Sequence, residues 1–301
     1  MSAIIIRALC FLAMVLLAFG LKKIHILSKE DGYALSRVIM NITLPCAIIS
    51  SFSSIELSGY LLIFIFFGLL ANGLLLLFSY LVCRKKSRED IIYYILSTPA
   101  YNIGNFTLPF ASAMLGPVGA VTTCLFDTGN AIQCVGIDYA VAKSMCDGEK
   151  KSVWSMFKPL LKVPTFMVYV IFIILSLIKA PIPSPFYEFT SLVATANGPI
   201  AMIMLGLLLE ISFDKNDLKK VINVLLMRYA ISLAFTLFFF FVLDVPYEVK
   251  KAACIVVWSP ISTAAPAFTL QLKGNTSLAG MVNSISLIIS LIIIPILVIV
   301  L

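Results

Sequence analysis

The chain has 301 residues, of which 61% are hydrophobic and 12% are charged, and its formal net charge is +7. A soluble domain carries about twice that share of charged residues, so the composition excludes an ordinary soluble protein. Apolar runs of roughly 20 residues recur from one end of the chain to the other, which indicates a membrane protein with several spans. The basic residues lie in short loops between these runs, a pattern that indicates membrane topology and argues against nucleic-acid binding.

Ten apolar segments predict ten membrane-spanning helices. The connections between them are short, and the longest is the polar, basic loop 143–160. The first segment lacks the basic leader and the small-residue cleavage site of a signal peptide, so we interpret it as a helix. The segments cover residues 3–21, 34–53, 58–82, 91–114, 117–142, 161–178, 187–211, 220–243, 248–271 and 276–300.

Lysine and arginine residues concentrate in every second loop, which orients the chain through the positive-inside rule. Arg7, which we interpret as an interfacial anchor, falls on the opposite side with Lys179, Lys250 and Lys251. We therefore expect the basic loops in the cytoplasm and both termini outside it, in the plasma (inner) membrane of a prokaryote. The basic set before and within the eighth segment consists of Lys215, Lys219, Lys220 and Arg228.

Four prolines suggest two halves of opposite topology, a common design in secondary transporters. Pro45 and Pro109 lie in the second and fourth segments, and Pro199 and Pro266 lie at a similar separation in the seventh and ninth. Five segments in each half would invert the second half automatically. We therefore predict an all-α membrane protein with two inverted five-helix repeats. The first repeat is 1–142, the cytoplasmic connecting loop is 143–160 and the second repeat is 161–301.

The stretch NIGNFTLPFASAMLG, residues 102–116, places polar side chains and a proline where a lipid-facing helix would not tolerate them. Pro109 removes a backbone donor, and Gly104 permits backbone angles that other residues resist. The ninth segment carries a matching stretch, SPISTAAP, with Pro260 and Pro266. We expect an unwound crossing over residues 102–109 near the membrane midplane, where helix N-termini would hold a carboxylate.

The predicted substrate-binding residues surround this crossing. An alternative for Ser259 and Ser262 is that they only allow close helix packing. The predicted helix-break residues are Gly104, Pro109, Pro260, Pro266, Pro45 and Pro199, and the predicted substrate-binding residues are Asn102, Asn105, Thr107, Ser262, Thr263 and Asn197.

Asp127 lies in the middle of the fifth segment. A charge at that depth costs at least about 2.5–3.5 kcal/mol on insertion scales, so we expect this acid to carry a proton or to coordinate a cation. Asn130 and Gln133 follow on nearby positions of the same helix and could share a polar network with it. The alternative is a structural hydrogen bond to a broken neighbouring helix. Asp138 and Glu210 lie nearer the cytoplasmic ends, where we expect them to snorkel or to pair with loop lysines.

The residues that usually carry catalysis or bind metals are scarce. No CxxC pair or dense cysteine cluster occurs. The only histidine, His25, lies in a loop, which excludes an HExxH metal site and a histidine-based triad. We therefore expect neither an enzyme nor a cofactor, apart from a proton or sodium as the coupling ion. The seven cysteines are Cys10, Cys46, Cys83, Cys124, Cys134, Cys146 and Cys254.

The order of these motifs resembles the auxin efflux carrier family in its bacterial form, which is related to the bile acid and sodium symporter-like proteins. The matching pieces are NITLPCAI, NIGNFTLPFASAMLG, LFDTGNAI and ANGPIAMIMLGLLLE, followed by the ninth segment with its prolines. The resemblance covers essentially the whole chain and rests on the order and spacing of short motifs. This chain departs from it at Thr107, where the family usually has a second glycine, and it lacks the long cytoplasmic loop of the plant members.

The resemblance implies ten helices in inverted repeats, with the fourth and ninth crossing at their breaks. It also implies elevator-like movement, a homodimer, and transport of a small organic anion such as a dicarboxylate or an auxin-like weak acid. We expect proton-coupled or potential-driven transport. A sodium-coupled symporter and a non-transporting receptor or channel-like protein are the alternatives. The family positions map to Asn102, Pro109, Asp127, Asn130 and Pro266.

Overall fold

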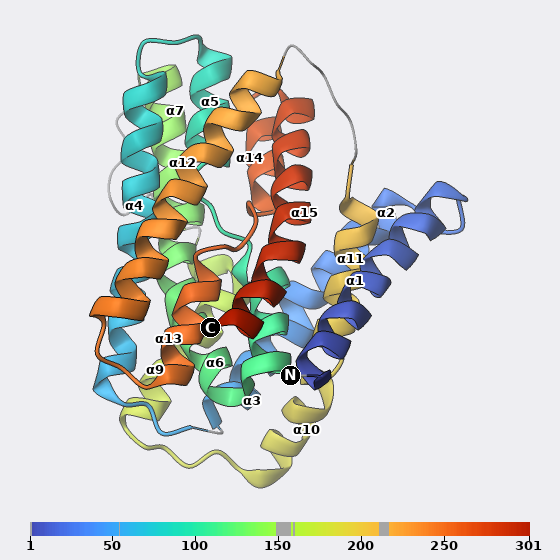
Figure 1. Ribbon diagram of the computed structural model, residues 1–301, viewed down its shortest axis with the longest axis vertical. Helices are drawn as coiled ribbons and strands as arrows, with labels where there is room; N and C mark the ends of the chain where they lie inside the picture. The colour runs from blue at the N-terminus through green and yellow to red at the C-terminus, as the bar shows by residue number, and fades with distance from the viewer. Residues whose placement is uncertain (1, 54, 149–157, 159, 211–216) are drawn as a thin grey trace.

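The computed structural model is all-helical over the residues that it describes, which are 2–53, 55–148, 158, 160–210 and 217–301 (Figure 1). The first half contains α1 (Ser2–Lys23), α2 (Lys29–Val38), η1 (Ile39–Thr43), α3 (Leu44–Ser53), η2 (Gly59–Leu62), α4 (Ile63–Cys83), α5 (Arg88–Ser97), η3 (Ile103–Thr107), α6 (Leu108–Ala131), η4 (Ile132–Asp138) and α7 (Tyr139–Asp147). The second half contains η5 (Leu160–Lys162), α9 (Pro164–Leu177), α10 (Ser184–Ala194), α11 (Asn197–Leu208), α12 (Leu218–Leu237), η6 (Phe238–Val242), α13 (Tyr247–Val256), α14 (Ala264–Gln271) and α15 (Thr276–Val300).

Seven helical segments among the described residues are long and apolar enough to cross a membrane. The longest, Ile103–Asp147, joins the end of the predicted fourth segment to the whole of the fifth. It turns sharply at Gly116, whose φ of 67° lies in the left-handed region that favours glycine, next to Pro117. The predicted boundary between these two segments is therefore marked by a bend and not by a loop.

The other predicted spans consist of shorter helices. The sixth is represented by α9, which has 14 residues. The fourth and ninth are interrupted, because α5 ends at Ser97 and α13 ends at Val256, several residues before the next helices begin. The predicted loop 143–160 starts later than expected, since α7 continues to Asp147; residues 149–157 and 159 lie outside the described part of the chain.

Most of the prolines expected to break helices lie inside regular helices instead. Pro45 and Pro109 each follow a π-helical turn, η1 or η3, in which the N–H of the preceding leucine bonds five residues back. The wider turn makes room for the proline ring, which would otherwise clash with the carbonyl four residues earlier. Pro199 and Pro266 lie in the first turns of α11 and α14, where a helix needs no N–H donor. Among the predicted break residues, Pro260 alone lies in unwound backbone.

By their contacts the helices form two groups. One group contains α1, α2, α3, α9, α10 and α11, and the other contains α4 to α7 and α12 to α15. The groups meet where α6 packs against α3, α9 and α11 and where α1 packs against α15. Both chain ends lie in the lower half of the molecule in Figure 1, whereas the α4–α5 and α14–α15 connections lie at its upper end.

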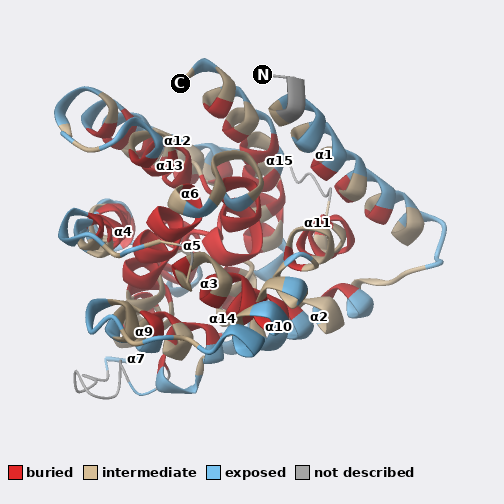
Figure 2. Cartoon of the chain, turned by 90° about the horizontal axis from the view of Figure 1, so that it is seen from below, coloured by how far each residue is buried: buried red, intermediate tan, exposed pale blue. Residues whose placement is uncertain are grey.

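Burial follows this arrangement. The most completely buried segments, including α5 and the start of α6, lie in the middle, and α1 exposes much of its surface (Figure 2). Leu16 and Leu17 of α1 are 57% and 61% exposed. In a membrane protein such apolar outer faces contact lipid, whereas irregular backbone must lie inside the helical bundle.

We predict that the close contact between α4 and α6 depends on two glycines. A Cβ atom on Gly129 would lie 2.2 Å from the carbonyl oxygen of Ile65, and one on Gly68 would lie 2.2 Å from the carbonyl oxygen of Phe126. Gly129→Leu should therefore push the helices apart and destabilise the protein by roughly 1–3 kcal/mol or more. Thermal unfolding in detergent should show a lowered midpoint. Gly73→Ala on α4, with no atom within 4 Å of the new Cβ, is the matched control; equal midpoints for both variants would contradict the prediction.

Candidate functional site

The two unwound segments lie against each other. Residues 98–102 separate α5 from η3, and residues 257–263 separate α13 from α14. The N–H of Asn102 donates to the carbonyl of Pro260 (2.8 Å), and the N–H of Ser262 donates to the carbonyl of Ala100 (3.1 Å). Tyr101 and Ile261 thereby form an antiparallel bridge. The two predicted breaks are in contact, but the first lies at 98–102, before the predicted range 102–109.

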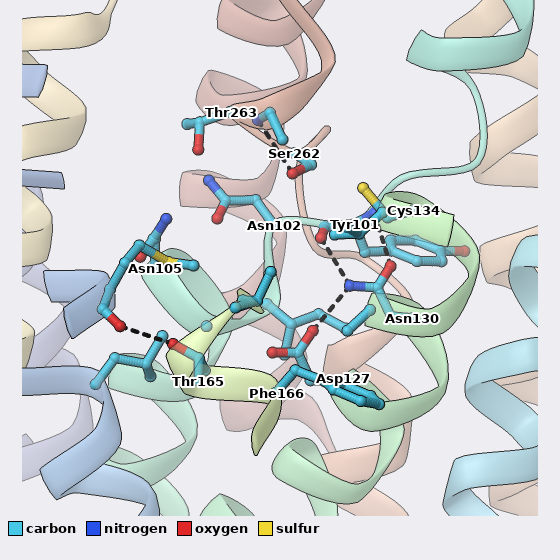
Figure 3. A pocket seen from close by; sticks show the side chains of 18 of the residues that line it. Tyr101, Asn102, Asn105, Asp127, Asn130, Cys134, Thr165, Phe166, Ser262 and Thr263 are labelled. Atoms are coloured by element: carbon cyan, nitrogen blue, oxygen red, sulfur yellow. Dashed lines mark hydrogen bonds between the residues drawn. The ribbon is translucent and has the colours of Figure 1, made fainter. Parts of the chain in front are cut away.

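Asn130 completes the backbone pairing of the first unwound segment (Figure 3). Its side-chain oxygen accepts from the N–H of Tyr101 (3.1 Å), and its amide nitrogen donates to the carbonyl of the same residue (3.0 Å). The side chain thus supplies the two hydrogen bonds that a neighbouring strand would supply. The same amide also donates to Asp127 (2.8 Å), so that one side chain links the unwound backbone to the buried acid.

Arg228 of α12 satisfies the carbonyls on the other side of the crossing. Its guanidinium donates to the carbonyl oxygens of Thr98 (2.6 Å), Ala100 (3.1 Å) and Ser259 (2.9 Å), with a longer contact to Pro99 (3.3 Å). The residue is 1% exposed. From its sequence, Arg228 was counted among the basic residues of the alternate loops, and that interpretation is wrong, because α12 extends well past Arg228 and carries it into the core.

Helix α15 supports the second unwound segment. The amide of Asn283 donates to the carbonyls of Ile261 (2.9 Å) and Ser262 (3.0 Å). Ser286 accepts from the N–H of Ile261 (3.0 Å), and the hydroxyl of Ser290 donates to the carbonyl of Trp258 (2.7 Å). The unwound backbone is therefore paired with side chains, as an apolar surrounding requires.

A cavity of about 350 Å³ lies beside the crossing (Figure 3). The first residues of η3 and α14, including Ile103, Gly104 and Ala264, line it, so two helix N-termini face the same space. Helix N-termini carry unpaired N–H groups and partial positive charge. The predicted residues that line the cavity are Asn102, Gly104, Asn105, Asp127, Asn130, Ser262 and Thr263.

Asp127 joins the two helix groups. It is 7% exposed, and besides Asn130 it accepts a hydrogen bond from the hydroxyl of Tyr169 on α9 (2.7 Å). A Cβ atom on Gly104 would lie 2.7 Å from the Leu44 side chain and 3.4 Å from an Asp127 oxygen, so this glycine leaves the space around the acid open. Asp127 is thus the acid that borders both the cavity and the contact between the groups.

Several predicted residues lie elsewhere. Thr107 is fully buried and its hydroxyl bonds to that of Ser259, behind the crossing. Asn197 accepts from the hydroxyl of Thr43 (2.9 Å), which ties α11 to η1 away from the cavity. These positions are polar because helices contact each other there, a pattern that sequence alone does not distinguish from a binding site.

The remaining acids and amides also differ from expectation in part. Gln133 donates to Asp138 (3.0 Å) and does not join the Asp127 network. Asp138 is 1% exposed, so it does not snorkel, because η4 turns it into the bundle. Glu210 does pair with a lysine, Lys29 at the start of α2.

A second cavity, of about 540 Å³, adjoins the first and contains this ion pair. The two cavities share Tyr33, Leu208, Thr263 and Ala267. The second one extends along α14 and α15 toward their connection, which holds Lys273. The site is therefore open toward the end of the molecule where α14 joins α15.

Four residues that contact the crossing or Asp127 were not predicted from the sequence, namely Tyr101, Tyr169, Arg228 and Asn283. The sequence does contain a signal for Arg228 and Asn283, because each is followed by further polar residues at helical spacing in an otherwise apolar helix. Arg228, Ser232 and Thr236 follow one another at intervals of four on α12, and Asn283, Ser286 and Ser290 lie on one face of α15.

Comparison with known proteins finds similarity to membrane transporters. The family model described as membrane transport protein matches residues 3–298. An uncharacterized transporter from Methanothermobacter thermautotrophicus is similar to this chain, with 27% identity over 229 residues that cover 74% of each chain.

We predict that Asn130→Ala destabilises the protein strongly. The change removes three hydrogen bonds and leaves both backbone groups of Tyr101 unpaired in the core, at about 1–3 kcal/mol for each buried polar group. The midpoint of thermal unfolding in detergent measures the effect. Asn41→Ala is the matched control, since that exposed amide donates only to Arg37 one turn earlier. Similar midpoints for the two variants would show that the Asn130 pairing is dispensable.

Proposed function

The chain belongs to the membrane transport protein family, and on this premise we propose that it is a secondary transporter of a small organic anion. The observation that carries the proposal is the cavity at the crossing, onto which two helix N-termini open together with the amides of Asn102 and Asn105. Such N-termini bind carboxylates without a direct lysine or arginine contact. No Lys or Arg is among the described residues that line this cavity.

The walls of the cavity favour one class of anion. Apart from its polar patch, the cavity is bordered by apolar side chains, among them Met40, Leu44, Val135 and Phe166. A second carboxylate would face these groups and lose its hydration without a compensating partner. The proposed substrate is therefore a weak acid with one carboxylate on an apolar body, and a dicarboxylate is the second candidate.

Asp127 supports coupling to protons. It borders the cavity and receives donors from both helix groups, so its charge influences the anion and the contact between the groups. An anion and an ionised acid in one buried site repel each other, and a proton on Asp127 removes this repulsion. Sodium is the second candidate, because carbonyl oxygens of unwound segments also suit a hard cation.

The proposed mechanism is elevator-like alternating access. The group that contains the crossing would move along α3, α9 and α11, and the Asp127–Tyr169 hydrogen bond would break during this movement. Leu44 lines the cavity at the crossing. Ala47, one turn further along α3, lines another cavity of about 250 Å³ between α3, α6 and α10. This smaller cavity would receive the substrate in the opposite state.

We also propose an architecture of two inverted repeats and an orientation of the chain in the membrane. Ten spans in two inverted repeats would place both termini outside the cytoplasm, and the position of both chain ends opposite the basic α4–α5 and α14–α15 connections supports this (Figure 1). A homodimer is proposed from the family resemblance. A receptor or a channel with the same fold is the competing function, and saturable uptake distinguishes a carrier from both.

The test is uptake by proteoliposomes of radiolabelled indole-3-acetate, malonate and malate, with and without an acidic exterior. We expect saturable accumulation of the monocarboxylate, increased by the pH gradient. Protein-free liposomes are an essential control, because a weak acid also crosses lipid in its neutral form. Uptake that never exceeds this control for any of the three anions would contradict the proposal.

We predict that Asp127→Asn abolishes the response to the pH gradient. Because the amide cannot take up a proton, net uptake should no longer rise with external acidity, whereas exchange of internal for external substrate should continue. Asp147→Asn at the exposed end of α7 is the matched control and should behave as the wild type. If Asp127→Asn retains a normal gradient response, the proton is carried elsewhere.

A further inference from the structure

Arg228 is a buried cation that the mechanism above does not use. All of its hydrogen bonds go to backbone carbonyls, and no carboxylate of the described residues pairs with it. A charged side chain inside a membrane protein is costly and commonly marks a functional position. The carbonyls that accept its hydrogen bonds show which partial negative charges the guanidinium neutralises.

The carbonyls that Arg228 binds lie in the unwound residues directly after the C-terminal ends of two helices. Thr98, Pro99 and Ala100 follow α5, and Ser259 follows α13. Each helix C-terminus carries about half of a negative elementary charge. One guanidinium therefore balances the ends of both helices together.

The N-termini at the same crossing are not balanced in this way. η3 and α14 begin on the far side of the unwound segments and point their positive ends at the cavity. Without Arg228, the negative ends of α5 and α13 would cancel much of this positive potential. With it, the crossing presents about one net positive charge to the cavity.

Tyr101 lies between the arginine and the cavity. The guanidinium carbon is 4.5 Å from the centre of the Tyr101 ring, and Tyr101 is itself a lining residue of the cavity. Asn130 fixes the backbone of Tyr101. Because Arg228 is buried, its positive charge is screened less at the cavity than a charge in water would be.

We propose that Arg228 determines the charge class of the substrate, a single anionic group, without touching it. The inference rests on the proposed function and adds the residue that makes the site select an anion. Arg228 is thus a specificity-determining residue that acts through the field of the crossing and through Tyr101. When ionised, Asp127 on the cavity wall opposes this positive charge.

The experiment compares two ligands that differ in charge but hardly in shape. Purified protein in detergent is titrated with tritiated indole-3-acetate and with its neutral amide, indole-3-acetamide, by scintillation proximity. The variants are Arg228→Met, Arg228→Lys and the control Lys220→Met, which removes a charge from the exposed end of the same helix.

We expect the wild type to prefer the carboxylate and Arg228→Met to lower this preference at least about tenfold, through weaker binding of the anion alone. Arg228→Lys should keep most of the preference, because the charge remains, and Lys220→Met should match the wild type. If Arg228→Met loses the preference for the carboxylate over the amide while Arg228→Lys keeps it, the inference is supported, even if Arg228→Met binds both ligands more weakly.

Two results would overturn the inference and leave the proposed function standing. One is an Arg228→Met variant that keeps the wild-type preference, and the other is loss of both ligands in both Arg228 variants, which makes the residue purely structural. A wild-type protein that binds neither ligand, or that binds both equally, would overturn the proposed function and this inference together.

Discussion

The structure depends on satisfying unwound backbone inside an apolar bundle. An unpaired carbonyl or N–H in hydrocarbon costs several kcal/mol, so two interrupted helices can meet there only if other groups supply every missing hydrogen bond. Asn130 does this for Tyr101, Arg228 for the carbonyls that follow α5 and α13, and Asn283 with two serines for the second segment. The polar residues of α6, α12 and α15 are largely explained by this requirement.

Interrupting two helices at one point has a functional consequence. Each break creates a C-terminus and an N-terminus, and antiparallel crossing places both N-termini on one side of the unwound backbone. The negative ends are covered by Arg228, and the positive ends remain available to a ligand. On the proposed function, this arrangement would hold an anion without a flexible basic side chain.

The prolines show how sequence motifs can mislead about geometry. Pro45 and Pro109 stand in the same TLP context, and in both places a π-helical turn absorbs the missing hydrogen bond and the helix continues. The break of the fourth span lies upstream, at 98–102, a segment that contains Pro99 and is held by Asn130 and Arg228. Whether a helix bends, widens or unwinds at a proline is decided by the side chains that surround it.

The amino-acid sequence alone determined that this is a multi-span helical membrane protein, that its fourth and ninth segments are interrupted, and that polar residues gather at the interruptions, where Asn102, Asn105, Asp127, Asn130, Ser262 and Thr263 line the cavity. These conclusions depend on hydrophobicity and on local chain preferences, which sequence records directly. Only the tertiary structure decided that Thr107 and Asn197 pack helices, that Tyr169 reaches Asp127 and that Arg228 lies at the crossing. Those roles depend on contacts between residues far apart in the chain, and polarity at one position does not reveal its partner.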